Sequence, residues 1–181
     1  MSTLQTGKDN TPFVAPISSF TKNDLLLAGG KAANLGELTR KGLAVPSGFV
    51  VTTSAYDFLL QHNEVQNQLL EMLSVADFEN ENPSSVAGTS RQIHDVFQKL
   101  FIPGQMIEAI VGAYRELDHG PVAVRSSATA EDLPRAAFAG QQETFLNVIG
   151  EQQLLDSVRA CWTSLWSERA ILYRARQNID Q

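Results

Sequence analysis

The sequence predicts a single soluble domain in which helices alternate with short strands. Its 181 residues fall within the roughly 100 to 200 of one ordinary domain, and 43% of them are hydrophobic, which is enough for a core. Apolar residues recur at helical spacing in several stretches, and short β-branched or aromatic runs lie between them. No internal repeat or linker divides the chain. No apolar run approaches the roughly 18 residues of a membrane helix, so we expect no membrane partner.

The first two thirds of the chain are predicted to be mostly helical. The expected elements are a mobile arm over residues 1–16, a short strand over 17–20, a helix over 31–41, a strand over 49–53, helices over 54–60 and 65–73, a loop over 78–90, and helices over 91–100 and 103–114. Gly42 supplies a stop signal for the first helix, Ser54 can cap the second, and Pro103 suits the first turn of the last.

The last third is predicted to contain two strands and one long helix. Val122–Val124 is a compact apolar run that predicts a buried strand, and it ends in Arg125. The chain is irregular from there to residue 140, and residues 144–148 again have the composition of a strand. Apolar residues at helical intervals predict a helix over 154–173.

The charge distribution limits where a binding site can lie. The sequence has 14 Lys and Arg against 20 Asp and Glu, a net charge of −6, which argues against a nucleic-acid binder because such proteins usually carry a basic stripe. No basic residue lies between Lys41 and Arg91, so an anion-binding site is expected outside this acidic middle. Cys161 is the only cysteine and no signal peptide is visible, so a cytoplasmic location is expected.

Lys31 is the first candidate binding residue. It follows Gly29-Gly30 at the start of a predicted helix, where glycines permit the close approach of a ligand and the helix N-terminus offers N–H groups to an anion. The segment is not a Walker A loop, because Leu25 and Ala32 stand where that motif needs Gly and Ser or Thr. From the residues alone, an exposed lysine on an amphipathic helix is the commoner interpretation.

Arg125 is the second candidate, because it ends the strand predicted over 122–124. Its planar guanidinium carries a fork of donors that suits a phosphate or a carboxylate. The alternative is an arginine paired with Glu131 or Asp132 inside a structural loop. The residues alone support these two interpretations equally.

The third candidate is the loop of residues 138–144, which contains Gly140, ends at Thr144 and follows two further alanines. Its small side chains would let backbone N–H groups close over a polyphosphate. A tight hairpin is the commoner explanation of such a pattern. No metal site is expected from the three histidines, which lie in separate segments without other ligands at metal-binding spacing.

Three segments taken together resemble one known family. They are GGKAANLGELTRKGLAVPSGFVVTTSAY (29–56), VAVRSSATAEDLPRAAFAGQQETFLNV (122–148) and CWTSLWSERAILYRARQNID (161–180). In order and spacing they are similar to the N-terminal nucleotide-binding domain of phosphoenolpyruvate synthase and its relatives, pyruvate phosphate dikinase and rifampicin phosphotransferase. The resemblance covers residues 17–181. It implies an α+β fold, the first lobe of an ATP-grasp domain with a mixed sheet and flanking helices.

The resemblance implies that ATP is the ligand of all three candidates. Lys31 and Arg125 are expected to bind the ATP phosphates and to support catalysis, the loop around Gly140 to cover them, and Thr144 to contribute a hydroxyl. Ala137 stands where relatives often have a serine, which removes one donor and spares the backbone contacts. Mg²⁺ is expected with the nucleotide, held by ligands outside this chain.

The resemblance also implies a reaction. Family members transfer a phosphoryl group from ATP to a histidine of another domain, and then to pyruvate or, in the antibiotic-modifying members, to rifampicin. We expect the second lobe and these further domains to lie outside this chain, which would be the ATP-binding part of a phosphotransferase and inactive in isolation. The alternative is a stand-alone nucleotide-binding or regulatory module without catalysis.

Overall fold

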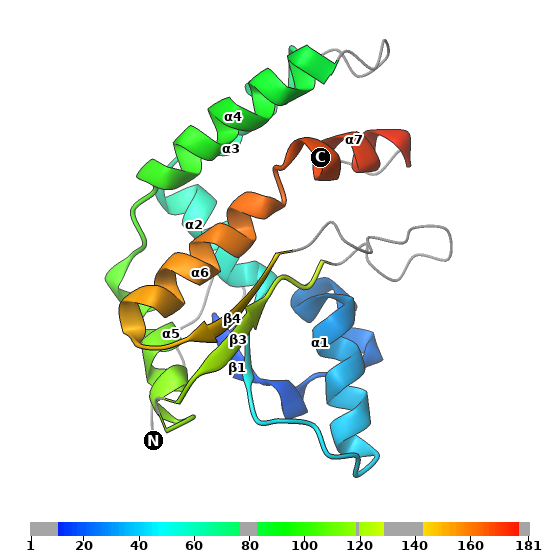
Figure 1. The fold of residues 1–181 in the computed structure, drawn as a ribbon, viewed down its shortest axis with the longest axis vertical. Coiled ribbons are helices and arrows are strands. Elements are labelled where there is room, and N and C mark those ends of the chain that lie inside the picture. The colour runs from blue at the N-terminus through cyan, green and yellow to red at the C-terminus, as the bar shows by residue number, and fades with distance from the viewer. Residues whose placement is uncertain (1–10, 77–82, 119, 129–142, 178–181) are drawn as a thin grey trace.

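Helices make up most of the fold, and two small antiparallel sheets lie among them (Figure 1). The computed structural model describes residues 11–76, 83–118, 120–128 and 143–177. In chain order these residues form β1 (Val14–Pro16), α1 (Leu25–Arg40), β2 (Phe49–Val51), α2 (Thr53–His62), α3 (Gln66–Ser74), α4 (Pro83–Lys99), α5 (Gly104–Arg115), β3 (Val122–Arg125), β4 (Thr144–Val148), α6 (Glu151–Ser164) and α7 (Glu168–Arg176). Across these ranges, none of the helices is both long and apolar enough for a membrane span.

The strands pair in two antiparallel ladders. β1 pairs with β2, with Val14 opposite Val51, and β3 pairs with β4, with Arg125 opposite Thr144. The α+β class is therefore confirmed, but the expected mixed sheet is replaced, within the described residues, by two pairs that are both antiparallel. β3 and β4 are consecutive strands, which can pair antiparallel through a loop alone, whereas a parallel pairing needs a crossover connection.

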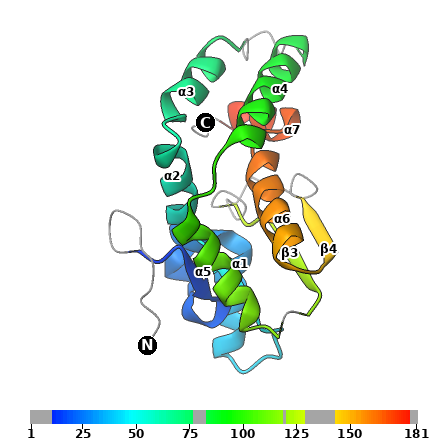
Figure 2. The same ribbon diagram turned by 90° about the vertical axis from the view of Figure 1, so that its left-hand side faces the viewer.

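Most of the core lies between the sheets and helices α2 to α7. Its largest fully buried side chains include Tyr114, Phe97 and Phe13, which come from three separate segments of the chain. α6 packs on both strands of the β3–β4 sheet and also contacts α4 and α5 (Figure 2). One face of this sheet is therefore covered by α6.

α1 packs on the rest of the molecule through small residues. Its buried positions are glycines and alanines, and two of the alanines form a second, smaller cluster with Phe20 and Val50. Gly36 lies so close to the preceding turn that an added Cβ would be 2.1 Å from the Phe20 carbonyl oxygen. The backbone of α1 therefore touches its neighbours directly.

The start of α1 lies earlier than the sequence predicts. α1 begins at Leu25, because a 3-10 turn over Lys22–Asp24 leads into it, but Gly29 interrupts its helical backbone. The segment that begins directly after Gly29 agrees with the helix predicted from Lys31. Thr21 and Asp24 form a capping box around this turn: the Thr21 hydroxyl accepts from Asn23 N–H, and an Asp24 carboxylate oxygen accepts from Thr21 N–H at 2.8 Å. Such a box satisfies N–H groups that have no partner within a helix.

The first strand also differs from its prediction. The sequence predicts a mobile arm up to residue 16 and a strand over 17–20, but the strand lies at Val14–Pro16 and residues 17–19 form a 3-10 turn. The fully buried Phe13 anchors β1 in the core. Pro16 ends the strand because proline has no N–H to donate to a ladder.

α4 begins at Pro83, inside the loop predicted over 78–90. Proline is favourable in the first turn of a helix, so the residue that suggested a loop is compatible with the helix start. Val86 is fully buried and the Ser90 hydroxyl donates to the Trp166 carbonyl oxygen at 2.8 Å. Contacts with distant segments therefore favour helix where the local composition favours a loop.

The single helix predicted over 154–173 is divided into α6 and α7. α6 ends at Ser164, and the Ser167 hydroxyl caps α7 by accepting from Ala170 N–H at 3.3 Å. Trp166 lies at the break, is buried, and donates its indole N–H to the Tyr56 hydroxyl at 2.8 Å. The spacing of apolar residues does not reveal this break, because Trp166 would belong to the core in one continuous helix as well as between two helices.

Candidate functional site

Part of α1 contacts a segment that lies far from it in the sequence. Residues 29–32 of α1 contact residues 126–128, which directly follow β3, and we call this contact the α1–β3 junction. Three hydrogen bonds join the two segments, one from each of three successive residues: Gly30 N–H to the Ala128 carbonyl oxygen at 3.0 Å, the Lys31 ammonium to the Ser126 carbonyl oxygen at 3.1 Å, and Ala32 N–H to the Ser127 hydroxyl at 3.2 Å. In Figure 1 the start of α1 lies beside the end of β3.

Gly29 makes this close contact possible. Its φ of +74° lies in the left-handed region that favours glycine, and it interrupts the helical backbone within α1. A Cβ added there would lie 2.1 Å from the Ser127 carbonyl oxygen and 2.5 Å from Ser127 Oγ. From the sequence, we expect a ligand to occupy the space beside Gly29 and to accept from the N–H groups that follow it. Instead, Ser127 fills that space, and Gly30 and Ala32 donate to the chain itself.

The Lys31 side chain reaches from α1 to the turn after β3. It is half-buried, and its charge acts on the Cys161 thiol of α6. Burial is the main reason that the pKa of this thiol is raised to about 12; Glu143 adds to the rise and Lys31 opposes it. Cys161 is therefore a protonated thiol at neutral pH and not a nucleophile, since nucleophilic attack requires the thiolate.

Arg125 and Thr144 lie together at the end of the β3–β4 sheet. They are direct cross-strand partners, and both side chains are exposed. Residues directly opposite each other in an antiparallel pair project from the same face of the sheet. Ser126 N–H donates to the Glu143 carbonyl oxygen at 3.3 Å, which continues the pairing into the junction. Strand pairing therefore holds Arg125 and Thr144 on one face, next to the residues that contact Lys31.

Part of the predicted site lies outside the described residues. This applies to Gly140 of the predicted covering loop, to Ala137 directly before that loop, and to Glu131 and Asp132, the alternative partners of Arg125. The candidates that the structure does bring to one end of the sheet are Lys31, Arg125 and Thr144.

These groups have a common chemistry. An ammonium, a guanidinium and a hydroxyl can all donate to the oxygens of a phosphate chain, and the two cations also supply opposite charge. Sequence reasoning does not identify Ser127 as the residue that holds the two segments together. The only signal in the sequence is a pair of serines directly after a strand, which does not reveal the distant N–H group that the hydroxyl accepts from.

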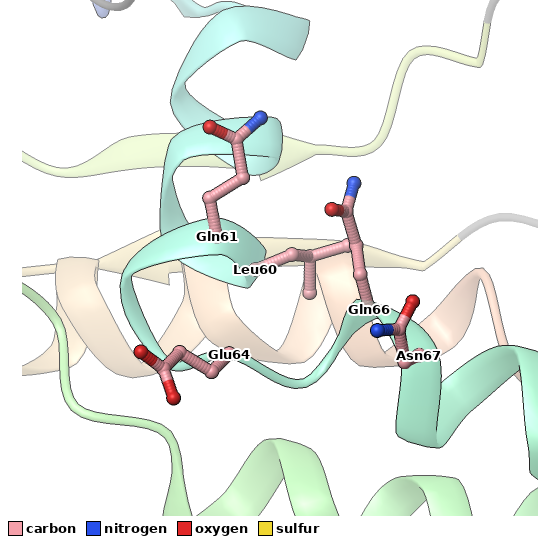
Figure 3. Close-up of a pocket in the computed structure, with 5 residues that line it drawn as sticks. All are labelled: Leu60, Gln61, Glu64, Gln66 and Asn67. Carbon is pink, nitrogen blue, oxygen red and sulfur yellow. The ribbon is translucent and has the colours of Figure 1, made fainter.

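A separate hollow lies at the corner between α2 and α3. It has a volume of about 610 Å³ and is lined by Leu60, Gln61, Glu64, Gln66 and Asn67 (Figure 3). In the close-up the amides of Gln61 and Gln66 point toward the same side, and Glu64 is the only charged residue in the lining. Without a cation in its lining, this hollow does not have the chemistry of a phosphate site.

Nearly the whole chain is similar to proteins of one known family. The family model described as "Pyruvate phosphate dikinase, AMP/ATP-binding domain" matches residues 25–181. A probable phosphoenolpyruvate synthase of Methanothermobacter thermautotrophicus is 42% identical over 98% of this chain, and the phosphoenolpyruvate synthase of Pyrococcus furiosus is 36% identical over 93%. The rifampicin phosphotransferase of Bacillus cereus is 41% identical, also over 93%. The chain spans 27%, 25% and 19% of the lengths of these three relatives.

Proposed function

Because the chain belongs to the pyruvate phosphate dikinase AMP/ATP-binding domain family, we propose that it is the ATP-binding part of a longer ATP-dependent phosphotransferase. The observation that carries the proposal is the α1–β3 junction, in which the Lys31 ammonium donates to Ser126, the residue after Arg125. The two cations come from separate segments that the hydrogen bonds of the junction hold together. A triphosphate, whose charge is spread over many oxygens, suits such an arrangement.

In this proposal each candidate residue has its own task. Lys31 and Arg125 neutralise the phosphates of ATP and stabilise the charge that develops during transfer. The Thr144 hydroxyl donates to a phosphate oxygen, and the loop around Gly140 covers the phosphates with backbone N–H groups. Exposure of Arg125 and Thr144 on one face supports this assignment, because a ligand can reach both side chains.

We propose further that the domain is the first lobe of an ATP-grasp fold. The α+β class supports this, and so does the packing of the β3–β4 sheet, which α6 covers on one face while Arg125 and Thr144 project exposed from its end. A nucleotide held against the exposed face would lie between this lobe and a second one. That lobe is proposed to lie outside this chain.

For the whole protein, the proposed reaction moves a phosphoryl group from ATP to a histidine of another domain, and from there to pyruvate. Relatives named phosphoenolpyruvate synthase support this acceptor. Rifampicin is the alternative acceptor, and the similar rifampicin phosphotransferase of Bacillus cereus supports it. The residues of the junction would contact only the phosphates, so they favour neither acceptor. The chain alone is expected to be inactive.

Mg²⁺ is proposed to enter with the nucleotide as MgATP. Within the part of the chain that the structure describes, no three His, Cys, Asp or Glu side chains gather into a possible metal site, and the proposal assigns no Mg²⁺ ligand there. A cytoplasmic location is proposed as well, because Cys161 is free and buried, as is usual in a reducing compartment.

Isothermal titration of the 181-residue chain with MgATP tests the proposed function. We expect a dissociation constant weaker than micromolar, and we expect Lys31→Ala and Arg125→Ala each to weaken binding at least about tenfold, as for the loss of a charge-assisted hydrogen bond. Lys99→Ala, which removes the same charge from the exposed end of α4, is the matched control and should leave binding unchanged. Equal affinity in all variants, sub-micromolar affinity, or steady ATP turnover by the chain would contradict the proposal.

A further inference from the structure

The N–H groups at the start of a helical segment have no partner within that segment. The first four N–H groups of a helix are in this position. In α1, Gly29 with its positive φ interrupts the helical backbone, so a second segment begins directly after it. Its Gly30 and Ala32 N–H groups are satisfied from the other side of the α1–β3 junction, by the Ala128 carbonyl and the Ser127 hydroxyl. Ser127 therefore acts as a capping residue for a helix that lies 95 positions before it in the sequence.

The two capping hydrogen bonds lie on either side of Lys31 in the sequence. The two capped N–H groups belong to the residues before and after it, and the third bond of the junction comes from its own ammonium. The Lys31 backbone is therefore held on both sides by the same turn that receives its side chain. Because that turn directly continues from Arg125, any movement of the turn away from α1 would separate the two cations.

We propose that Ser127 is a positioning residue for the phosphate-binding pair Lys31 and Arg125. Its hydroxyl accepts from Ala32 N–H and thereby fixes the turn after β3 on the start of the second segment of α1. Gly29 is needed for the same contact, since only a residue without Cβ leaves room for the Ser127 backbone. The inference rests on the proposed function, because it assumes that Lys31 and Arg125 bind phosphate together.

A binding experiment with inorganic tripolyphosphate tests this inference on the 181-residue chain. Tripolyphosphate is a suitable probe because it presents a phosphate chain without the adenosine. Ser127→Ala removes the acceptor of the Ala32 N–H bond and should weaken tripolyphosphate binding by about three- to tenfold, the equivalent of one hydrogen bond. Ser127→Thr keeps the hydroxyl and should restore binding to near the wild-type affinity.

Ser167→Ala is the matched control. Ser167 caps α7 through the same kind of bond, a serine hydroxyl that accepts from a backbone N–H at 3.3 Å, but it is not part of the junction. The Ser127→Ala and Ser167→Ala variants should both melt at a lower temperature than the wild-type chain, because each loses one helix cap. Only Ser127→Ala should lose affinity for tripolyphosphate, which separates positioning from a general loss of stability.

The outcomes distinguish this inference from the proposed function. If the wild-type chain binds tripolyphosphate and Ser127→Ala binds equally well, the inference is wrong and the proposed function stands. The inference is also wrong if Ser167→Ala loses as much affinity as Ser127→Ala. If neither MgATP nor tripolyphosphate binds to the wild-type chain, the proposed function fails and the inference fails with it. Should Ser127→Ala not fold, Ser127→Cys replaces it: its sulfur is a weak acceptor, so reduced affinity supports the inference and full affinity overturns it.

Discussion

The helical core and the α1–β3 junction hold their residues in place by different physical means. The core is built from large side chains such as Tyr114 of α5 and Phe97 of α4, which are fully buried and come from helices that both pack on α6. The junction has almost no side-chain bulk. It consists of a glycine with positive φ and three hydrogen bonds, one between two backbone groups and two that involve the Lys31 ammonium and the Ser127 hydroxyl.

This difference shows how each region would respond to change. The stability of the core is spread over many contacts, so a change of volume there mainly alters the free energy of unfolding. The junction depends on contacts between a few atoms, which lie directly beside Lys31 and the end of β3. A change there should alter the position of the proposed phosphate-binding groups as well as stability.

The largest loss of stability is expected from truncation in the core. Phe97→Ala removes a fully buried ring and should lower the free energy of unfolding by about 3 to 5 kcal/mol, measured by urea denaturation. Phe101→Ala makes the same change at a ring that is 63% exposed and should cost far less. An equal loss from the two variants would show that this core is not packed as described.

A smaller loss of stability, with a larger effect on binding, is expected at the junction. Gly29→Ala forces a Cβ into the Ser127 backbone at a positive φ and should cost about 3 kcal/mol through strain and overpacking. Gly112→Ala is the control: it lies within α5, an added Cβ there meets nothing within 4 Å, and the change should stabilise the chain by about 0.5 to 1 kcal/mol. Calorimetry with MgATP should find weaker binding only for Gly29→Ala. Unchanged binding by a folded Gly29→Ala chain would show that the close contact at Gly29 does not position the site.

At pH 10 the smallest effect on stability is expected at Cys161 of α6, whose thiol is influenced by the charges of Lys31 and Glu143. The pKa of this thiol rises from 9.0 to about 12 on folding, so above pH 9 the unfolded chain loses the proton while the folded chain keeps it. Stability should therefore fall between pH 9 and 12, by about 1.4 kcal/mol at pH 10. Cys161→Ala should lack this part of the pH dependence. Parallel stability profiles of the two chains in this range would contradict the pKa shift.

The sequence predicts the elements whose character is local. β4 has the predicted bounds, and β3 extends its predicted bounds only by Arg125, because short β-branched runs between turn signals leave few alternatives. The prediction that β3 is buried is wrong: its residues alternate between half-buried and exposed, because α6 covers one face of the sheet. The early part of α4 and the break after α6 instead make hydrogen bonds with distant segments: Trp166, at the break, bonds to Ser90 of α4 and to Tyr56 of α2. Such contacts leave no periodic trace in the sequence.

The sequence alone suggests which residues belong to the candidate site, but it does not show which backbone contacts hold them together. Lys31 and Arg125 are conspicuous as cations at the start of a helix and the end of a strand, and the family resemblance singles out both. The space next to Gly29 is conspicuous too, but its occupant depends on the tertiary fold. Ser127 occupies it because β3–β4 pairing and the kink in α1 bring two distant backbone segments into contact.

The most direct test of the account is a map of the phosphate-binding surface by nuclear magnetic resonance. Backbone amide shifts of the 181-residue chain would be followed during titration with MgATP. The account predicts the largest shifts at residues 29–32, 125–128 and 144, around the α1–β3 junction. Largest shifts at residues 60–67, around the hollow between α2 and α3, with the junction unchanged, would contradict it.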